Sequence, residues 1–183
     1  MPRTAEIIAV GSELLTGGVT NTNARFLSEL LTAAGVDVLY HTAVGDDEGR
    51  LEAAVTAARQ RAELLVCTGG LGPTYDDMTK TAVCAALDTP LVFHPDIVPD
   101  IRRYFDTVFH REMPACNLQQ AYLPQDCTVL RNTVGTATPW VPPPAAPLPP
   151  AASPPCCCPA SPRSAAIWRS TACCPIWSGS TAR

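Results

Sequence analysis

The sequence contains no uninterrupted apolar run of the roughly 18 to 20 residues that a membrane-spanning helix needs. Its first eleven residues also lack the basic and then apolar pattern of a secretory signal peptide. A basic surface is missing too, because the formal net charge is -4 and the pI is about 5.3. Nucleic acids and anionic membranes bind to basic surfaces. We therefore expect a cytoplasmic protein that binds neither of them and holds any phosphate through local contacts.

The nine cysteines do not show the spacing of a metal site or of a disulfide framework. Five of them are consecutive neighbours at positions 156–158 and 173–174, where they cannot easily share one tetrahedral ion. The others occur singly in apolar or loop contexts, and we expect buried or half-buried thiols: Cys67, Cys84, Cys116 and Cys127. A chain of 183 residues with 46% hydrophobic content is long enough for one well-buried core.

The sequence changes character close to residue 138. After residue 140 it contains no Asp, Glu or Lys, and proline, alanine and cysteine predominate. Proline is excluded from helix interiors and central strands, so residues 141–155 indicate a polyproline-like linker or a disordered tail. We therefore expect a folded domain over residues 1–137 and an irregular, low-complexity tail over residues 138–183.

A second interpretation of the tail is translation out of frame, which gives this composition when the coding sequence is rich in GC. After a shift of one base, Cys156 to Ala160 can encode an apolar residue followed by Leu-Leu-Pro-Gly. The same shift lets Cys173 to Trp177 encode Val-Leu-Pro-Tyr-Leu. Residues 141–155 give nothing clear in the shifted frame. Under this hypothesis the slip lies near residues 137–141, and the product is an inactive remnant.

Apolar periodicity in the first part of the chain predicts alternating strands and helices. Strands are predicted at residues 5–10, 36–42 and 64–68. Helices are predicted at residues 24–34, 46–61 and 97–109, with a further helix that starts at residue 77 or 79 and ends at residue 87. This alternation is typical of a doubly wound α/β fold with a mostly parallel sheet. Ligands bind beyond the carboxyl ends of the strands in such sheets. The loops after the first and third strands are therefore candidate site loops.

A glycine-rich loop follows the third predicted strand, and its residues are Thr68, Gly69, Gly70, Leu71, Gly72, Pro73 and Thr74. Glycines let backbone amides approach a ligand closely, and the N-terminus of a following helix attracts phosphate. The loop therefore indicates an anion site, although it matches neither a Walker A loop nor a dinucleotide fingerprint. A tight turn from strand to helix would explain the same glycines.

Carboxylates follow each of the predicted strands. Asp76 and Asp77 come directly after the glycine-rich loop, and a divalent ion such as Mg²⁺ between carboxylate and phosphate oxygens would reconcile them with an anion site. Helix capping would need only one of the two. Asp46 is either a helix cap or a further acid in the same cleft. Gly11 and Glu13 follow the first strand, where a plain turn would also explain the glycine.

Two segments resemble the amino-terminal domain of CinA (competence/damage-inducible) proteins: Glu6 to Leu15, and Thr68 to Thr74 with Asp76 to Thr79. Further motifs follow in the same order: Asn21-Thr22-Asn23, Val44-Gly45-Asp46, Met113-Pro114, Asn117 with Gln120-Ala121, and Asn132 to Ala137. The resemblance covers residues 5–137 and extends to the wider MoaB/Mog family of molybdopterin-binding domains. It implies a three-layer α/β/α fold, truncated here at its C-terminal end.

The resemblance implies a nucleotide or a pterin as the small-molecule ligand, and a chain that can form homo-oligomers. CinA-type members imply metal-dependent cleavage of ADP-ribose to AMP and ribose 5-phosphate, and Mog-type members imply molybdopterin binding. Asp46 and Asp77 match the acidic, catalytic positions of the relatives, and we expect Asp76 and Asp77 to hold the metal. The expected ligand-binding residues are Gly11, Glu13, Thr68, Gly69, Gly70, Gly72 and Thr74. The deamidase domain of longer CinA proteins has no counterpart here, so we expect no deamidase activity.

Overall fold

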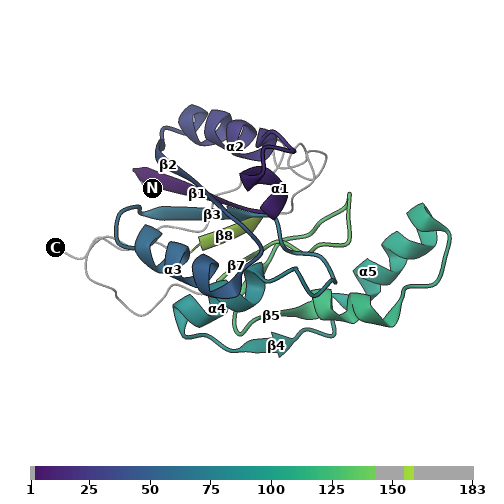
Figure 1. Cartoon of the computed structure of the whole chain (residues 1–183). Coiled ribbons are helices and arrows are strands. Elements are labelled where there is room, and N and C mark those ends of the chain that lie inside the picture. Colours follow the sequence, from purple (N-terminus) through teal and green to yellow (C-terminus); the bar gives the residue numbers. More distant parts are fainter. Residues whose placement is uncertain (1–2, 143–154, 159–183) are drawn as a thin grey trace.

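The computed structural model describes residues 3–142 and 155–158 (Figure 1). Its strands are β1 (Thr4–Val10), β2 (Asp37–Val44), β3 (Leu64–Thr68), β4 (Leu91–Phe93), β5 (Tyr122–Pro124), β6 (Thr128–Val129), β7 (Trp140–Val141) and β8 (Pro155–Cys158). Its α-helices are α1 (Ser12–Leu15), α2 (Thr22–Ala33), α3 (Glu48–Ala58), α4 (Thr79–Leu87) and α5 (Val98–Tyr104). A π-helix, η1 (Phe105–Phe109), continues α5, and a 3-10 helix, η2 (Ala115–Ala121), precedes β5.

Six strands form the central sheet in the order β2-β1-β3-β8-β7-β6. The pairs β1–β2, β1–β3 and β3–β8 are parallel, whereas β7 runs antiparallel to both of its neighbours. Helix α2 lies on one side of this sheet and α3 and α4 lie on the other, so the fold has three layers (Figure 1). A separate antiparallel ribbon of β4 and β5 lies beyond α4. The expected α/β fold with a mostly parallel sheet is confirmed.

Strand β1 is the centre of the core because both of its faces are covered by helices. Its side chains alternate between the faces, so that Ile7 packs with Ala24 of α2 while Ile8 packs with Leu51 and Val55 of α3. Ile7 and Ile8 are both 0% exposed. A continuous apolar run is therefore the sequence signature of this strand, and it gave the strand's position correctly.

One charged side chain also lies in this core. Glu6 of β1 is 0% exposed, and its carboxylate accepts hydrogen bonds from Arg61 at 2.7 and 2.8 Å and from the Thr42 hydroxyl at 2.6 Å. The hydrogen bonds with Glu6 raise the pKa of Arg61. The guanidinium also lies 4.3 Å from the centre of the Tyr40 ring. Buried carboxylates need such partners, because desolvation without them is costly.

The helix starts differ from the sequence expectations by one or two residues. Asn21 caps α2 by accepting a hydrogen bond from the Ala24 amide at 3.0 Å, and Asp47 caps α3 by accepting one from the Arg50 amide at 2.8 Å. The cap of α3 is therefore not Asp46. Several consecutive residues here have side chains that can cap a helix, so composition alone cannot select the one with the right backbone angles. The loop after β1 begins with the short helix α1.

The sheet continues beyond residue 137. Trp140 in β7 is 0% exposed, and its backbone pairs with Cys157 of β8, which in turn pairs with Cys67 of β3. Pro155 occupies the first position of β8, where a strand tolerates proline. Four residues of the proline- and cysteine-rich segment thus form a strand inside the sheet, which its composition did not indicate. Residues 143–154 and 159–183, on which the linker and reading-frame interpretations depend, lie outside the described residues.

Three of the four singly placed cysteines agree with the expectation of buried or half-buried thiols. Cys67 and Cys84 are buried and Cys127 is half-buried, whereas Cys116 is exposed at the start of η2. Burial raises the pKa of Cys84 to about 12 and that of Cys127 to about 11. Across residues 3–142 and 155–158, no helix has both the length and the apolarity needed to cross a bilayer.

Candidate functional site

The loops after β1, β2 and β3 meet at the carboxyl edge of the sheet. The parallel register pairs Val10 with Val44 and Ala9 with Thr68, so these strands end side by side. The Gly11 amide donates to the Val44 carbonyl at 2.9 Å and extends this alignment into the first loop. The sequence-predicted site residues on the three loops are therefore brought to one edge, as the topology of parallel sheets requires.

Ser12 and Asp46 connect the first two of these loops. The Ser12 amide donates to Asp46 Oδ2 at 3.0 Å, and the Asp46 amide donates to Ser12 Oγ at 3.1 Å. Gly45 allows this approach, because a Cβ on it would lie 3.3 Å from Ser12 Oγ. Among the described residues, the other carboxylate oxygen of Asp46 accepts no hydrogen bond. Asp46 is thus a fixed carboxylate at the site edge with one oxygen available.

Glu13 lies over the end of β1. A Cβ on Gly11 would meet the Glu13 carboxylate, with Oε2 at 2.7 Å and Cδ at 2.8 Å. Any other residue at position 11 would therefore displace this carboxylate. The structure brings Gly11 and Glu13 together at the site edge, where Glu13 is exposed.

Two glycines of the loop after β3 are required by the fold itself. Gly69 and Gly70 have φ values of 96° and 58°, a region that favours glycine. A Cβ on Gly69 would collide with the Val10 carbonyl, and one on Gly70 with the Thr79 hydroxyl. Thr79 closes the loop, since its hydroxyl donates to the Gly69 carbonyl at 2.7 Å and its amide to the Gly70 carbonyl at 3.2 Å. The tight turn therefore accounts for both glycines.

The same turn leaves backbone donors without partners. Within the described part of the chain, the amides of Gly70, Leu71 and Gly72 donate no hydrogen bond to protein atoms. Successive amides of this kind in a glycine-bearing loop form a concave donor surface that suits an anion. Thr68, at the end of β3, is fixed beside them because its hydroxyl accepts a hydrogen bond from Asn23 Nδ2 at 3.3 Å. Asn23 therefore connects α2 with the site edge.

Asp77 fixes the outer half of this loop. Its Oδ2 accepts hydrogen bonds from the Thr74 amide at 2.8 Å and the Thr74 hydroxyl at 2.5 Å, and its own amide donates to the Thr74 carbonyl at 3.2 Å. The carboxylate also lies against Gly72, where a Cβ would be 2.5 Å from Oδ2. Asp76, one position earlier, is exposed. Both side chains present oxygen atoms, which are the ligands that Mg²⁺ prefers.

No group of three His, Cys, Asp or Glu side chains in the described ranges lies close enough to hold a metal ion. Asp76 and Asp77 would therefore hold an ion only together with oxygen atoms from a bound ligand or from water, as is usual for Mg²⁺ with phosphates. The binding loops around them contain no Lys or Arg at residues 11–21, 45–47 and 69–78. A phosphate at this edge would thus meet backbone amides and acidic side chains.

Sequence reasoning missed two polar features of the site region. It did not single out Ser12, because the partner of this serine lies 34 positions away. It also missed Lys80, which is 7% exposed in the first turn of α4 and donates to the Gln119 carbonyl at 2.6 Å. Nearby, Asn117 and Gln120 are buried and share a hydrogen bond of 3.2 Å. Their place among the CinA-like motifs was the only signal for this polar cluster.

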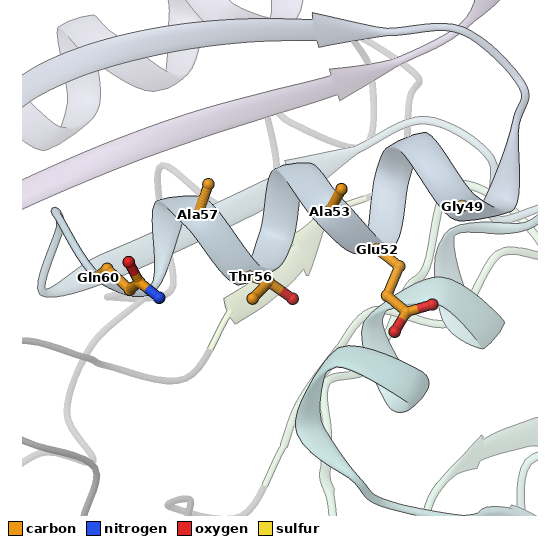
Figure 2. Close-up of a pocket in the computed structure, with 6 residues that line it drawn as sticks. All are labelled: Gly49, Glu52, Ala53, Thr56, Ala57 and Gln60. Atoms are coloured by element: carbon orange, nitrogen blue, oxygen red, sulfur yellow. The ribbon is translucent and has the colours of Figure 1, made fainter.

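A surface pocket lies along α3 and shares no lining residue with the three loops. It has a volume of about 520 Å³ and is open to solvent along one side of α3, as Figure 2 shows. Its lining consists of Gly49, Glu52, Ala53, Thr56, Ala57 and Gln60. None of these residues belongs to the three loops, and the lining carries only one charged side chain. We therefore assign the candidate site to the carboxyl edge and not to this pocket.

Comparison with known proteins gives matches over most of the chain. The family model described as "Probable molybdopterin binding domain" matches residues 6–171. The "Putative competence-damage inducible protein" of Acetivibrio thermocellus is 48% identical over 133 residues, and that of Geobacillus sp. strain WCH70 is 50% identical over 133 residues. Each alignment covers 73% of this chain and 32% of the relative. The chain therefore spans about a third of the length of the curated relatives it matches.

Solved structures show the same architecture. The protein CinA with unknown function from Thermoplasma acidophilum has a TM-score of 0.79 at 28% identity, and the match covers 92% of this chain and 95% of that one. The molybdopterin biosynthesis enzyme MoaB from Thermus thermophilus has a TM-score of 0.53 at 19% identity, covering 89% and 84%. At that identity the second likeness shows the fold alone. Both matches agree with the resemblance found in the sequence.

Proposed function

Because this chain belongs to the probable molybdopterin binding domain family, we propose that the carboxyl edge of its sheet binds a phosphate-bearing small molecule and hydrolyses ADP-ribose to AMP and ribose 5-phosphate. The observation that carries the proposal is that the unpartnered amides of Gly70 to Gly72 and the fixed carboxylates of Asp46 and Asp77 lie on loops at one edge of the sheet. An anion site without a basic side chain fits a ligand that binds together with its own cation.

A divalent ion such as Mg²⁺ would be held by Asp76 and Asp77 and would neutralise the charge that develops on the pyrophosphate during hydrolysis. The amides of Gly70, Leu71 and Gly72 bind phosphate oxygens and orient the pyrophosphate. The free oxygen of Asp46 takes a proton from the attacking water. The water oxygen bonds to one phosphorus as the bond from that phosphorus to the bridging oxygen breaks, which yields AMP and ribose 5-phosphate.

The Asp77→Asn variant tests this assignment. An asparagine keeps an oxygen that can accept the Thr74 hydrogen bonds but loses the negative charge that the ion requires. With Mg²⁺ and ADP-ribose, we expect the wild-type chain to release AMP and the variant to be at least about 100-fold slower, a loss within the range for removal of one electrostatic group. The thermal midpoint of both proteins, followed by circular dichroism, serves as the folding control. A folded variant with full turnover would show that Asp77 does not hold the ion.

Binding of molybdopterin is the second candidate function, and the description of the family favours it. The same amides would hold the phosphate of the pterin without any hydrolytic step. Calorimetry with ADP-ribose and with a pterin phosphate separates the two functions, since binding of the pterin alone would reject the nucleotide proposal. A cytoplasmic location and a homo-oligomer stay predictions, and sedimentation of the purified chain would test the second.

A further inference from the structure

Tyr75 is the most exposed large hydrophobic side chain among the described residues, with 90% of its surface open to solvent. It lies in the loop after β3, between Thr74 and Asp76. A ring with this exposure adds almost nothing to the hydrophobic core, because the free energy gained on folding scales with the apolar area that is buried. Folding therefore does not explain a tyrosine at this position.

The backbone beneath Tyr75 is nevertheless held by hydrogen bonds within its own turn. The Asp77 amide donates to the Thr74 carbonyl at 3.2 Å, so residues 74–77 form a turn with Tyr75 and Asp76 at its tip. The two further hydrogen bonds from Thr74 to the Asp77 carboxylate brace this turn from the side. The side chain of Tyr75 thus projects from a fixed point, which lowers the entropic cost of placing a ligand against it.

Tyr75 also differs from the other exposed aromatic residues of the described chain. Phe93 and Tyr122 contact each other with ring centres 5.2 Å apart, Tyr40 lies under the Arg61 guanidinium, and Phe109 packs on Tyr104 and Phe105. Among the described residues, Tyr75 has no ring partner and no hydrogen bond. Residues 11–21, 45–47 and 69–78 contain no other aromatic side chain. The site edge thus carries one free ring.

We propose that Tyr75 determines ligand specificity by stacking on the fused nitrogen heterocycle of the ligand, with its phosphate held by the amides of Gly70 to Gly72. This inference rests on the proposed function only in placing the ligand at this edge. A purine and a pterin both present the flat ring that such stacking requires, and base-aromatic stacks are strong enough to be measured by substitution.

Two variants separate the ring from the rest of the side chain. Tyr75→Phe keeps the aromatic face, and Tyr75→Leu keeps an apolar side chain without it. The probes are AMP and ribose 5-phosphate, titrated by calorimetry in the presence of Mg²⁺. We expect Tyr75→Leu to weaken AMP binding about 5-fold or more, with wild-type and Tyr75→Phe affinities alike. Binding of ribose 5-phosphate, which has no base, should be equal in all three proteins.

A spectroscopic readout distinguishes stacking from a structural role. Ring currents should shift the adenine proton resonances upfield when AMP binds to the wild type or Tyr75→Phe, and this shift should be absent with Tyr75→Leu. Unchanged affinity of Tyr75→Leu for both AMP and a pterin phosphate, with unchanged shifts, would overturn the inference while leaving the hydrolysis proposal intact. Conversely, ring-dependent AMP binding by a chain that releases no AMP from ADP-ribose would support Tyr75 and reject hydrolysis.

A parallel titration with a pterin phosphate identifies the source of the heterocycle. If Tyr75→Leu loses binding of the pterin alone, stacking is supported and the ligand that stacks on Tyr75 is a pterin. Absence of wild-type binding to both AMP and the pterin would overturn the inference. A change of oligomeric state in Tyr75→Leu, seen by light scattering, would also overturn it, because the ring would then be a contact between subunits.

Discussion

Ser12 and Asp46 hold each other through two reciprocal hydrogen bonds, of 3.0 Å from the serine amide and 3.1 Å to the serine hydroxyl. Each residue follows a strand of the parallel pair β1 and β2, so the bonds join two loops that lie 34 positions apart in the chain. The backbone bond fixes one oxygen of the carboxylate, and the hydroxyl bond fixes the backbone of Asp46. The orientation of the carboxylate is thereby fixed, and its second oxygen stays available to accept a hydrogen bond.

We expect Ser12→Ala to lower the turnover of ADP-ribose about 10-fold with little change in KM. The variant removes the hydrogen bond that positions Asp46, the proposed general base, but leaves the amide donors of Gly70 to Gly72 in place. Ser12→Thr keeps the hydroxyl and should restore most of the activity. The cost in stability should be about 1 kcal/mol or less, as for one exposed hydrogen bond. Steady-state kinetics and urea unfolding measure the two effects. Equal losses in both variants would show that the hydroxyl itself is not the positioning group.

Gly17, in the loop after β1, provides a matched control for Gly69, in the loop after β3. Both have a positive φ, of 74° for Gly17 and 96° for Gly69, but a Cβ on Gly17 would have nothing within 4 Å, whereas one on Gly69 would collide with the Val10 carbonyl. We expect Gly17→Ala to cost about 1 kcal/mol of unfolding free energy from backbone strain alone. Gly69→Ala should cost about 3 kcal/mol or more, because the clash is with backbone that cannot move aside. Chemical denaturation gives both values, and similar costs would show that the two strands can separate at this edge.

The sequence predicted the strands and helices that carry strong local signals. The third strand was predicted with the bounds of β3, because its short apolar run ends at a glycine. Helix α4 was predicted to end at Leu87, because Pro90 follows soon after its apolar stripe. The contacts of Ser12 with Asp46 could not be predicted, since they depend on the register of β1 against β2. Strand β8 was missed for a similar reason. Its local composition disfavours a strand, and it is the pairing with β3, distant in the sequence, that favours one.

The site shows the same division between local and distant information. The sequence correctly predicted that Asp77 follows a glycine-rich loop and that it lies at the carboxyl edge of the sheet. Its hydrogen bonds to Thr74 are local as well, but the collision that Gly69 avoids involves Val10 on another strand. The functional assignment of Asp46, Asp76 and Asp77 stays a prediction, which Asp77→Asn tests directly for Asp77 and the Ser12 variants test indirectly for Asp46.

The buried thiol of Cys84 should make the protein sensitive to alkali. Burial raises its pKa from 9.0 to about 12, so the folded state keeps the proton that the unfolded chain releases. The contribution of Cys84 to stability is therefore fully present below pH 9 and is lost as the pH rises from 9 towards 12. Thermal midpoints at pH 8 and pH 10 should differ more for the wild type than for Cys84→Ala. Of Cys67, Cys84, Cys116 and Cys127, a thiol reagent at pH 8 should modify the exposed Cys116 first and Cys84 only on unfolding.

Trp140 provides the test of where the folded domain ends. The sequence placed the boundary at residue 137, but this side chain is 0% exposed in the core formed with α3 and α4. We expect Trp140→Ala to cost about 3 to 5 kcal/mol of unfolding free energy, as for other large aromatic residues removed from a core. Trp140→Phe should cost much less, because the ring still fills most of the space and the indole N–H that it removes has no partner among the described residues.

Truncation after Ala137 extends this test from one side chain to the strand. The shortened chain lacks β7 and β8, so β3 loses its outer neighbour and the core loses Trp140. We therefore expect the truncated protein to expose apolar surface, to bind a hydrophobic dye and to lose its cooperative thermal transition. A truncated chain that unfolds cooperatively at the midpoint of the full chain would place the boundary at residue 137, as the sequence predicts. In that case the pairing of β8 with β3 would contribute nothing to the stability of the domain.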